Sequence, residues 1–406
     1  MIRIFGYRFA GWSLVCVSLL GCSAANSRPI MPALPQSSAN AATSGTFTLL
    51  YALGAKSDDG SNPEGSLAVV KGIIYSATRY SYDYDPSHGS VIGVRLSGHE
   101  KVVCTLEGPG EPLAGLTGVQ GTVFGTGYVG GSSDGGAVFS LTPSCMMRVL
   151  HSFRGGRDGA HPRADLLYFN GKLYGTTEDG GGPHHGCGSQ CGTVFTVGIA
   201  GGHEVVYRFR GYTHGDGSRP FAGLIRVRGL FYGTTEVGGA YDRGTVYSLS
   251  PSGRERVLHS FGAPGDGQLP FAGLDYAHGR LFGTTWQGGA YQGPYGGAGT
   301  VFSLSTSGKE RVVYNFRAGD DGANPVSGLV SRNGTLYGTT RGGGIGSCRC
   351  GTIFSVTAGG RERVLHSFQD DDGSAPGELV DVAGKLFGSA YSGGRYGKGT
   401  IFSFDP

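Results

Sequence analysis

Short runs of alternating hydrophobic and polar residues recur along most of the chain, and Gly, Asp or Ser bounds each run. One copy, read from Phe271, is FAGLDYAHGRLFGTTWQGGAYQGPYGGAGTVFSLSTSGKERVVYNF. Its GL, LFGTT, GTVFSL and ERVVYNF phrases are short and rich in β-branched or aromatic residues, so each is typical of a strand. Copies follow one another about every fifty residues from Thr46 to Pro406. This repeat predicts an all-β propeller with four strands per blade.

The fourth strand of the repeat occurs seven times, and its distribution predicts how the ring closes. The copies are FTLLYAL (47–53), KVVCTL (101–106), RVLHSF (148–153), VVYRF (205–209), RVLHSF (256–261), RVVYNF (311–316) and RVLHSF (363–368). The chain therefore starts on a fourth strand, whereas its last repeat stops after the third. Pairing of residues 47–53 with 399–404 would remove two exposed strand edges. We therefore expect a seven-bladed β-propeller whose N-terminal strand completes the last blade.

The N-terminus has the features of an export signal. Arg3 and Arg8 precede an apolar run from Phe9 to Leu20, too short for a mature membrane helix. The run ends in LLGC and resembles the lipobox of bacterial lipoproteins, which implies lipidation of Cys22. An ordinary secretory peptide, cut after Ala24 or Ala25, is the alternative.

Three segments follow from this interpretation. Residues 1–21 are the expected signal peptide, residues 22–45 a flexible tether rich in Ser, Ala and Pro, and residues 46–406 the propeller. The expected location is the outer membrane or the cell surface, with a periplasmic or secreted protein as the alternative. Membrane contact is expected through the lipid anchor alone.

Composition and charge narrow the range of partners. Gly accounts for 79 of the 406 residues, but the glycines return at fixed offsets in turns and at strand ends. The net charge is +3 with no basic block, which argues against nucleic acid as a partner. No phosphate loop, HExxH or Ser-His-Asp order is present, so we expect no cofactor and no such catalytic centre. The propeller is expected to be a monomer.

Six cysteines remain if Cys22 is lipidated and the signal is removed, and an oxidising compartment favours disulfides. Cys187 and Cys191 lie in one loop, and Cys348 and Cys350 lie in the equivalent loop three blades later. Each pair can close its own loop. His184 and His185 beside the first pair make a zinc site the alternative there. The sequence leaves the pairing of Cys104 and Cys145 open.

The repeated phrases point to a known family. They are L-[YF]-GTT, GG, GT-[VI]-[FY]-S-[LV] and Asp-Gly-x-x-Pro, best kept in LYGTTEDGG, FYGTTEVGG, LFGTTWQGG and LYGTTRGGG of blades 3 to 6. Blades 1, 2 and 7 depart from them with IYSATRYSY, FGTGYVGG and FGSAYSGG. The pattern resembles the GloVer tandem repeat of exported bacterial proteins. The resemblance implies exported propeller-like repeats and supplies no established activity or catalytic residues.

The loop from the fourth strand to the next blade carries Asp-Gly in six blades. The aspartates are Asp59, Asp158, Asp216, Asp266, Asp321 and Asp372, and a Pro follows three residues after each Gly. Asp-Gly favours a tight turn because Asp bonds the nearby backbone and Gly accepts a positive φ. A calcium site would need several oxygens converging within one loop. We therefore interpret these loops as structural turns.

The loop from the second to the third strand opens on the same face and begins with a residue that differs between blades. These residues are Arg79, Tyr128, Glu178, Glu236, Trp286, Arg341 and Tyr391, with Tyr241, Tyr291, Tyr295 and Tyr396 farther along the loops. Aromatic faces beside carboxylates and guanidinium groups suit a glycan or a protein or peptide. The sequence therefore predicts a non-catalytic recognition or scaffold module that binds through this ring, with Trp286 as its best anchor. The alternative is a solvated rim without a ligand.

Two sets of residues raise the question of catalysis. Glu178 and Glu236 lie on adjacent blades, and a glycosidase needs two carboxyl groups about 5 to 10 Å apart. A carbohydrate-active enzyme using this pair is therefore the alternative function. His151, His259 and His366 occupy one column of the fourth strand, in line with Val and Phe of the same strands. We expect these histidines to pack between blades.

Overall fold

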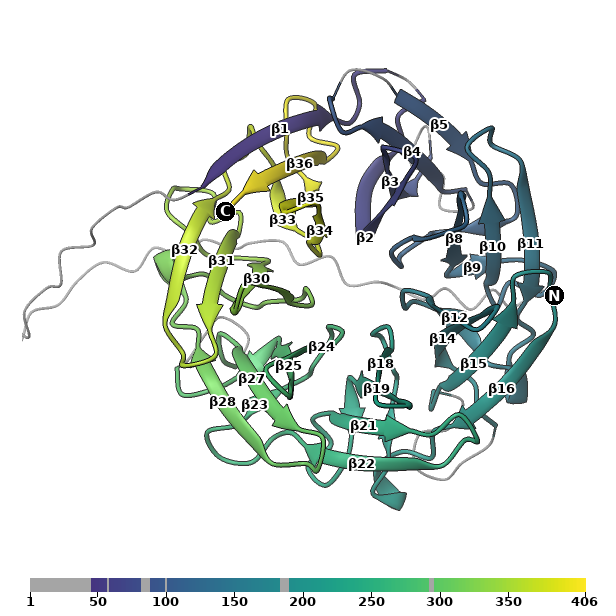
Figure 1. The fold of residues 1–406 in the computed structure, drawn as a ribbon, viewed down its shortest axis with the longest axis vertical. Coiled ribbons are helices and arrows are strands. Elements are labelled where there is room, and N and C mark those ends of the chain that lie inside the picture. Colours follow the sequence, from purple (N-terminus) through teal and green to yellow (C-terminus); the bar gives the residue numbers. More distant parts are fainter. Residues whose placement is uncertain (1–44, 57, 82–87, 99–100, 183–189, 292–295) are drawn as a thin grey trace, which may run out of the picture. The chain divides into compact units, whose positions relative to one another are not determined.

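The computed structural model describes residues 45–56, 58–81, 88–98, 101–182, 190–291 and 296–406 (Figure 1). The predicted signal peptide, Cys22, all of the predicted tether except its last residue, His184, His185, Cys187 and Tyr295 lie outside these residues. Seven blades follow the chain in order around a common axis, each with four antiparallel strands. The predicted fold class is therefore confirmed.

The first three blades follow one another from Ser61 to Arg208. Blade 1 contains β2 (Ser61–Val70), β3 (Ile73–Tyr80), β4 (Ser90–Arg95) and β5 (Lys101–Thr105). Blade 2 contains β7 (Thr117–Val119), β8 (Thr122–Gly127), β10 (Ala137–Leu141) and β11 (Met147–Ser152). Blade 3 contains β12 (Ala160–Pro162) and β13 (Leu167–Phe169), which both pair with β14 (Lys172–Asp179), followed by β15 (Thr193–Gly198) and β16 (His203–Arg208).

The remaining blades keep the same order. Blade 4 contains β18 (Ile225–Val227), β19 (Leu230–Thr235), β21 (Thr245–Leu249) and β22 (Glu255–Ser260). Blade 5 contains β24 (Asp275–Ala277), β25 (Arg280–Thr285), β27 (Thr300–Ser305) and β28 (Glu310–Asn315). Blade 6 contains β29 (Val330–Arg332), β30 (Thr335–Thr340), β31 (Thr352–Thr357) and β32 (Glu362–Ser367). Blade 7 contains β33 (Ser374–Pro376) and β34 (Val380–Val382), which both pair with β35 (Lys385–Ser392). They are followed by β36 (Thr400–Asp405) and β1 (Thr46–Ala52).

Short elements decorate the loops. Three two-residue ribbons pair β6 (Pro109–Gly110) with β9 (Val129–Gly130), β17 (Gly217–Ser218) with β20 (Val237–Gly238), and β23 (Gly267–Gln268) with β26 (Gln287–Gly288). The described residues also form the single 3₁₀ turns η2 (Gly156–Asp158), η3 (Tyr212–His214) and η4 (Gly319–Asp321). Within the described ranges, no helix is long and apolar enough to cross a membrane.

The ring closes by the predicted pairing of the two chain ends. Strand β1 runs antiparallel to β36, with Phe47 opposite Phe404. Beyond the strand, the Leu53 amide donates to the Gly399 carbonyl at 2.9 Å, and the Leu53 side chain is fully buried. The Phe47 ring lies 5.6 Å from Phe368 of blade 6. The first strand therefore completes blade 7 and also packs against blade 6.

The GTT and GT phrases have a physical explanation in hydrogen bonds. In blade 5 the second Thr, Thr285, lies 2.8 Å from Thr300 across the neighbouring strand, hydroxyl to hydroxyl. The first Thr, Thr284, donates to the Ser327 carbonyl of blade 6 at 3.0 Å. The Gly before them, Gly283, is required because a Cβ there would clash with the Phe302 ring. One phrase thus joins two strands within a blade and one blade to the next.

The Asp-Gly loops are turns, as expected, and each aspartate is also held by the preceding fourth strand. Asp266 accepts hydrogen bonds from the amides of Gly262 and Gly267 and lies 3.0 Å from Nε2 of His259. Tyr or His plays this part in six blades, in the pairs Tyr51–Asp59, His151–Asp158, Tyr207–Asp216, His259–Asp266, Tyr314–Asp321 and His366–Asp372. The histidine column therefore fixes turns between blades, in addition to packing on Phe residues such as Phe261.

Disulfides connect several of the cysteines. Cys104 of β5 pairs with Cys145 of the next blade, which joins blades 1 and 2 and resolves a pairing that the sequence left open. Cys348 pairs with Cys350 within one loop, as expected. Cys191 is disulfide-bonded as well, while Cys187, its expected partner, lies outside the described residues.

Candidate functional site

The seven variable residues after the second strand fall into two groups. Trp286, Arg341 and Tyr391 line a cavity of about 460 Å³ at one end of the propeller axis. The other four are Arg79, Tyr128, Glu178 and Glu236. Each of them contacts the side chain of a residue that precedes a repeated Pro. The predicted ring is thus only partly a cavity lining.

The contacts of the second group follow a rule. For Arg79, Tyr128 and Glu178, the residue before the repeated Pro of the next blade reaches back to the variable residue, whereas Glu236 pairs with Arg219 of its own blade. Glu111 pairs with Arg79 at 3.2 Å, His161 stacks on Tyr128 at 4.8 Å between ring centres, and Arg219 pairs with Glu178 at 2.6 Å. In the first group, the side-chain amide of Asn324 donates to the Trp286 carbonyl, and that of Asn62 donates to the Tyr391 carbonyl.

A left-handed backbone makes these contacts possible. The residue before the Pro has a φ between 42° and 57° in all seven blades: Asn62, Glu111, His161, Arg219, Leu269, Asn324 and Ala375. Its carbonyl accepts the amide of the variable residue in its own blade, as in Leu269 with Trp286 at 3.0 Å. The backbone conformation therefore fixes both the variable residue and the side chain that meets the preceding blade.

The acidic pair of the enzymatic alternative is bound by one arginine. Arg219 lies 2.6 Å from Glu178 and 3.0 Å from Glu236, and its guanidinium also lies over the Phe221 ring. Burial raises the pKa of Glu236, and the Arg219 charge counteracts this. A cation between the two carboxylates occupies the position where a scissile bond would have to lie. Through Arg219, the two glutamates form a contact between blades 3 and 4.

The cavity is lined by a second variable ring, which the sequence analysis missed. The residue after the repeated Pro lines it in all seven blades: Glu64, Leu113, Arg163, Phe221, Phe271, Val326 and Gly377. Like the first ring, this position varies inside a fixed frame, in the phrases PEGSL, PLAGL, PRADL, PFAGL, PFAGL, PVSGL and PGEL. That variation was the available signal. It was overlooked because only the Asp, Gly and Pro of the phrase were considered.

Two further carboxyl groups reach the axis from the position before the repeated Leu. This position is Ser or Gly in five blades, and it is Asp165 in blade 3 and Glu378 in blade 7. Asp165 accepts hydrogen bonds from the Ser66 hydroxyl and the Gly115 amide of the two preceding blades. Small residues at the other blades leave space for these side chains, since a Cβ on Gly328 would meet the Glu378 carboxyl.

Burial in the cavity shifts the protonation of these acids. It raises the pKa of Glu378 to about 8, with repulsion from Asp165 as a further cause. Burial also raises the pKa of Asp165, although its two hydrogen bonds act in the opposite direction. The pKa of Glu64 is raised by burial and lowered by Arg79, Arg163 and Arg341. Glu378 therefore keeps its proton to a higher pH than an ordinary carboxyl group, and in that form it can donate a hydrogen bond.

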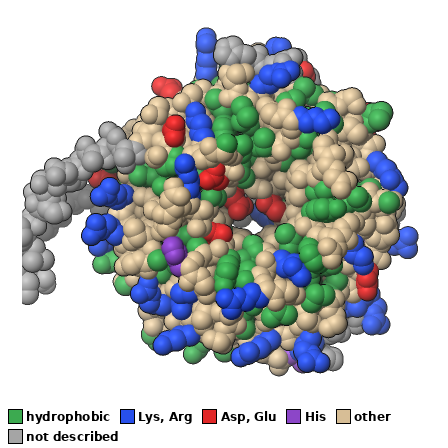
Figure 2. All heavy atoms as spheres, viewed as in Figure 1, with side chains coloured by type: hydrophobic (Ala, Val, Ile, Leu, Met, Phe, Trp, Pro, Cys, Tyr) green, Lys and Arg blue, Asp and Glu red, His purple; other side chains and the backbone are tan. Residues whose placement is uncertain are grey.

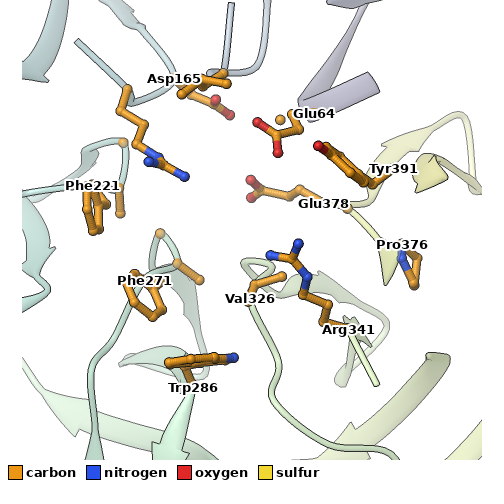
Figure 3. Close-up of a pocket in the computed structure, with 18 of the residues that line it drawn as sticks. Glu64, Asp165, Phe221, Phe271, Trp286, Val326, Arg341, Pro376, Glu378 and Tyr391 are labelled. Atoms are coloured by element: carbon orange, nitrogen blue, oxygen red, sulfur yellow. The ribbon is translucent and has the colours of Figure 1, made fainter. Parts of the chain in front are cut away.

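The cavity has two unlike sides. Figure 3 shows Glu64, Asp165 and Glu378 pointing into the space from one side, beside Tyr391, whereas Phe221, Phe271 and Trp286 lie on the other. The Phe271 ring lies 5.5 Å from Phe221 and 5.4 Å from Trp286. Acidic side chains also gather around the central opening in Figure 2. An aromatic surface thus faces hydrogen-bonding groups across one cavity.

One protein family model matches this chain over the whole propeller. The family model described as the Gloeobacter/Verrucomicrobia repeat matches residues 39–188, 184–348 and 290–406. No curated protein matches the chain.

Solved structures share the fold at low sequence identity. Puromycin hydrolase is 11% identical with a TM-score of 0.51, over 82% of this chain and 50% of that one. A luciferin-regenerating enzyme is 10% identical with a TM-score of 0.43, over 89% of this chain and 95% of that one. A putative 6-phosphogluconolactonase from Bacteroides uniformis is 13% identical with a TM-score of 0.48, over 74% and 83%. This chain spans half the length of puromycin hydrolase. At 11% identity, the likeness to puromycin hydrolase shows the fold alone.

Proposed function

Because the chain belongs to the Gloeobacter/Verrucomicrobia repeat family and the variable residues after its repeated Pro meet at one axial cavity, we propose that it is an exported recognition module that binds a carbohydrate in that cavity. The observation that carries the proposal is the aromatic surface of Phe221, Phe271 and Trp286 opposite Glu64 and Glu378. A sugar ring offers C–H groups on one face and hydroxyl groups at its edge. Aromatic rings pack against the former, and carboxyl and guanidinium groups bond the latter.

The size of the cavity supports a small ligand unit. About 460 Å³ lies within the usual range for small-molecule sites and accommodates one or two sugar residues of a longer glycan. Arg163 and Arg341 line the same cavity, so charged groups of both signs are available for hydrogen bonds. A peptide side chain inserted into the cavity is the competing ligand class.

Arrays of glycans and peptides, probed with the oxidised protein lacking its signal peptide, test the ligand class. We expect glycans to be retained and peptides not. Calorimetric titration of the strongest glycan then compares the parent with Phe271→Ala, and with Tyr212→Ala as a matched control. Tyr212 is an exposed aromatic residue on η3, away from the cavity lining. Binding to peptides alone, or equal losses in both variants, would reject the proposal.

Catalysis on a carbohydrate is the second candidate, and Glu378 is the observation that favours it. An acid that keeps its proton at neutral pH can act as a general acid, and burial raises the pKa of Glu378 to about 8. Chromatography of the bound glycan after incubation tests this directly. A recognition module leaves the glycan intact. An enzyme releases sugar and stops doing so in Glu378→Gln, or in a Glu178 and Glu236 double variant if the original pair is used.

Lipid anchoring through Cys22 is part of the same proposal. The disulfides and the repeat family are consistent with export. Cys22→Ser should move the protein from the membrane fraction to the soluble fraction of its host without changing the propeller. A parent protein found only in the soluble fraction would argue for simple secretion.

A further inference from the structure

One junction between blades gathers three metal-ligating side chains. His151 of β11, Asp158 of η2 and His203 of β16 offer ligand atoms that all lie within 4.8 Å of one another. The His151 Nε2 atom is 3.3 Å from one Asp158 oxygen, and the His203 Nδ1 atom is 3.3 Å from the other. The three side chains are only 16%, 22% and 11% exposed, respectively.

Other junctions use the same three positions with different residues. The residue corresponding to His203 is Glu255, Glu310 or Glu362 at the next three junctions and Phe47 at the closing one. Among the described Asp-Gly junctions, two imidazoles meet one carboxylate only at His151, Asp158 and His203. The Nε2 atom of His203 is buried and has no hydrogen-bond partner. The repeat frame alone does not require a histidine at position 203.

We propose that His151, Asp158 and His203 bind a Zn²⁺ ion that joins blades 2 and 3. Zinc takes imidazole nitrogens and carboxylate oxygens at about 2.0–2.2 Å in a tetrahedron, so neighbouring ligand atoms lie about 3.3–3.5 Å apart. His151 and His203 each lie 3.3 Å from a different oxygen of Asp158, so whichever oxygen binds the ion already has one imidazole nitrogen at this spacing. A water molecule supplies the fourth ligand.

Binding requires a local rearrangement that the junction permits. The two rings are stacked, with centres 3.8 Å apart and planes 4° from parallel. Both rings must rotate about χ2 to direct their in-plane lone pairs at one ion, and this torsion has broad preferences in His. One Asp158 oxygen already accepts the Arg154 amide at 2.9 Å, which orients the carboxylate and leaves a lone pair for the metal.

Some of the charged groups near the three side chains oppose a bound cation and others favour it. Arg154 and Arg208 lie near the imidazoles and oppose a cation, whereas Glu204 favours one. Arg154 is exposed, so solvent and salt screen its charge. The carboxylate of Asp158 offsets one of the two charges of the ion directly.

The closing junction provides a matched variant within the same chain. There the Phe47 ring stacks on His366 at 4.1 Å with an angle of 4°, the same arrangement as His203 on His151. His203→Phe should therefore preserve the packing and remove one ligand. The reverse change, Phe47→His, should place a second imidazole beside His366 and Asp372, which already lie 2.9 Å apart.

The test is calorimetric titration of the oxidised, metal-free protein with ZnCl₂, with native mass spectrometry to count bound ions. We expect one ion per parent chain, a loss of affinity of at least about 100-fold in His203→Phe, and a second ion in Phe47→His. Zinc should raise the melting temperature of the parent and leave that of His203→Phe unchanged.

A variant lacking His184 and His185 serves as the control, because these residues formed the zinc alternative in the sequence. It should bind zinc as the parent does. The proposal is overturned if the parent binds no zinc, if His203→Phe binds it as tightly, if Phe47→His gains no ion, or if removing His184 and His185 abolishes binding.

Discussion

The junctions between blades and the axial cavity use the same repeat in opposite ways. At the junctions, Asp of the turn meets Tyr or His of the fourth strand in blade after blade, as in Asp216 with Tyr207 and Asp266 with His259. Around the cavity, corresponding positions hold Glu64, Arg163 and Phe271. Positions that recur hold the ring together, whereas the positions after the repeated Pro differ between blades and shape the cavity. The repeat thus separates architecture from recognition within each blade.

Removal of the closing strand should have the largest effect on the architecture. Deletion of residues 46–53 exposes an edge of β36 and removes Leu53, which is fully buried. We expect the melting temperature to fall by about 10 °C or more, because each blade depends on its neighbours. Deletion of residues 22–45 is the control and should leave the melting temperature unchanged. Equal thermal denaturation curves for the two deletions would contradict strand-mediated closure.

Loss of one junction aspartate should have the next largest effect. Asp266→Ala removes the acceptor for the amides of Gly262 and Gly267 and for His259. We expect a loss of about 2–3 kcal/mol in the free energy of unfolding, measured by urea denaturation, with carbohydrate affinity unchanged.

Asp242→Ala is the matched control, because Asp242 is an exposed loop aspartate whose side chain accepts a hydrogen bond from the Gly238 amide. It should cost about 1 kcal/mol or less. If Asp266→Ala weakened binding without lowering stability, the division between junction and cavity would be wrong.

Loss of an aromatic side chain from the cavity should lower the affinity for the carbohydrate rather than the stability of the fold. Trp286→Ala removes part of the aromatic surface, and loss of such an anchor commonly costs about 2 kcal/mol, or about thirtyfold in affinity. His259→Ala should lower the melting temperature and leave affinity nearly unchanged, since His259 bonds Asp266 at the junction. Calorimetry and thermal denaturation of both variants check the two readouts. Normal binding by Trp286→Ala together with weak binding by a stable His259→Ala would move the site to the junction.

The pH dependence of stability sharpens the description of the junctions. Burial raises the pKa of Glu362 to about 8, helped by the charge of Asp321 and a hydrogen bond to it and opposed by Tyr314 and Arg317. The folded pKa lies above the unfolded value, so this stabilising contribution is complete below the unfolded pKa and is lost as pH rises through about 8.

Glu362→Gln, which resembles the protonated acid, should therefore raise the melting temperature by a few degrees at pH 9 and leave it nearly unchanged at pH 4. The histidines at the zinc junction titrate in the opposite sense, because burial lowers the pKa of His151 and of His203, the latter to about 4. Comparison of parent and variant cancels that contribution. The same melting difference at both pH values would show that Glu362 does not titrate in this range.

Most of the architecture could be predicted because the same strand pattern recurs seven times along the sequence. The orphan strand at 47–53 and the missing fourth strand at the C-terminus specified the closure. Side-chain contacts between one blade and the next could not be predicted in this way. The Cys104–Cys145 disulfide spans 41 residues, and so does the Arg219–Glu178 pair. Both depend on how one blade meets the next.

The candidate site was predicted only in part for the same reason. Three residues of the variable ring after the second strand, Trp286, Arg341 and Tyr391, line the cavity. The ring also included Glu178 and Glu236, which are both paired with Arg219 of blade 4. Glu378 was missed because a single acid in a column of small residues is conspicuous only once that column is known to face the axis.

A crystal structure of the protein with the strongest glycan from the array tests the central claim most directly. We predict a sugar ring packed against Phe271 and Trp286, with hydroxyl groups within hydrogen-bonding distance of Glu64 or Glu378. A glycan bound on the outer strands or at an interblade junction, with the axial cavity free of sugar, would contradict the account.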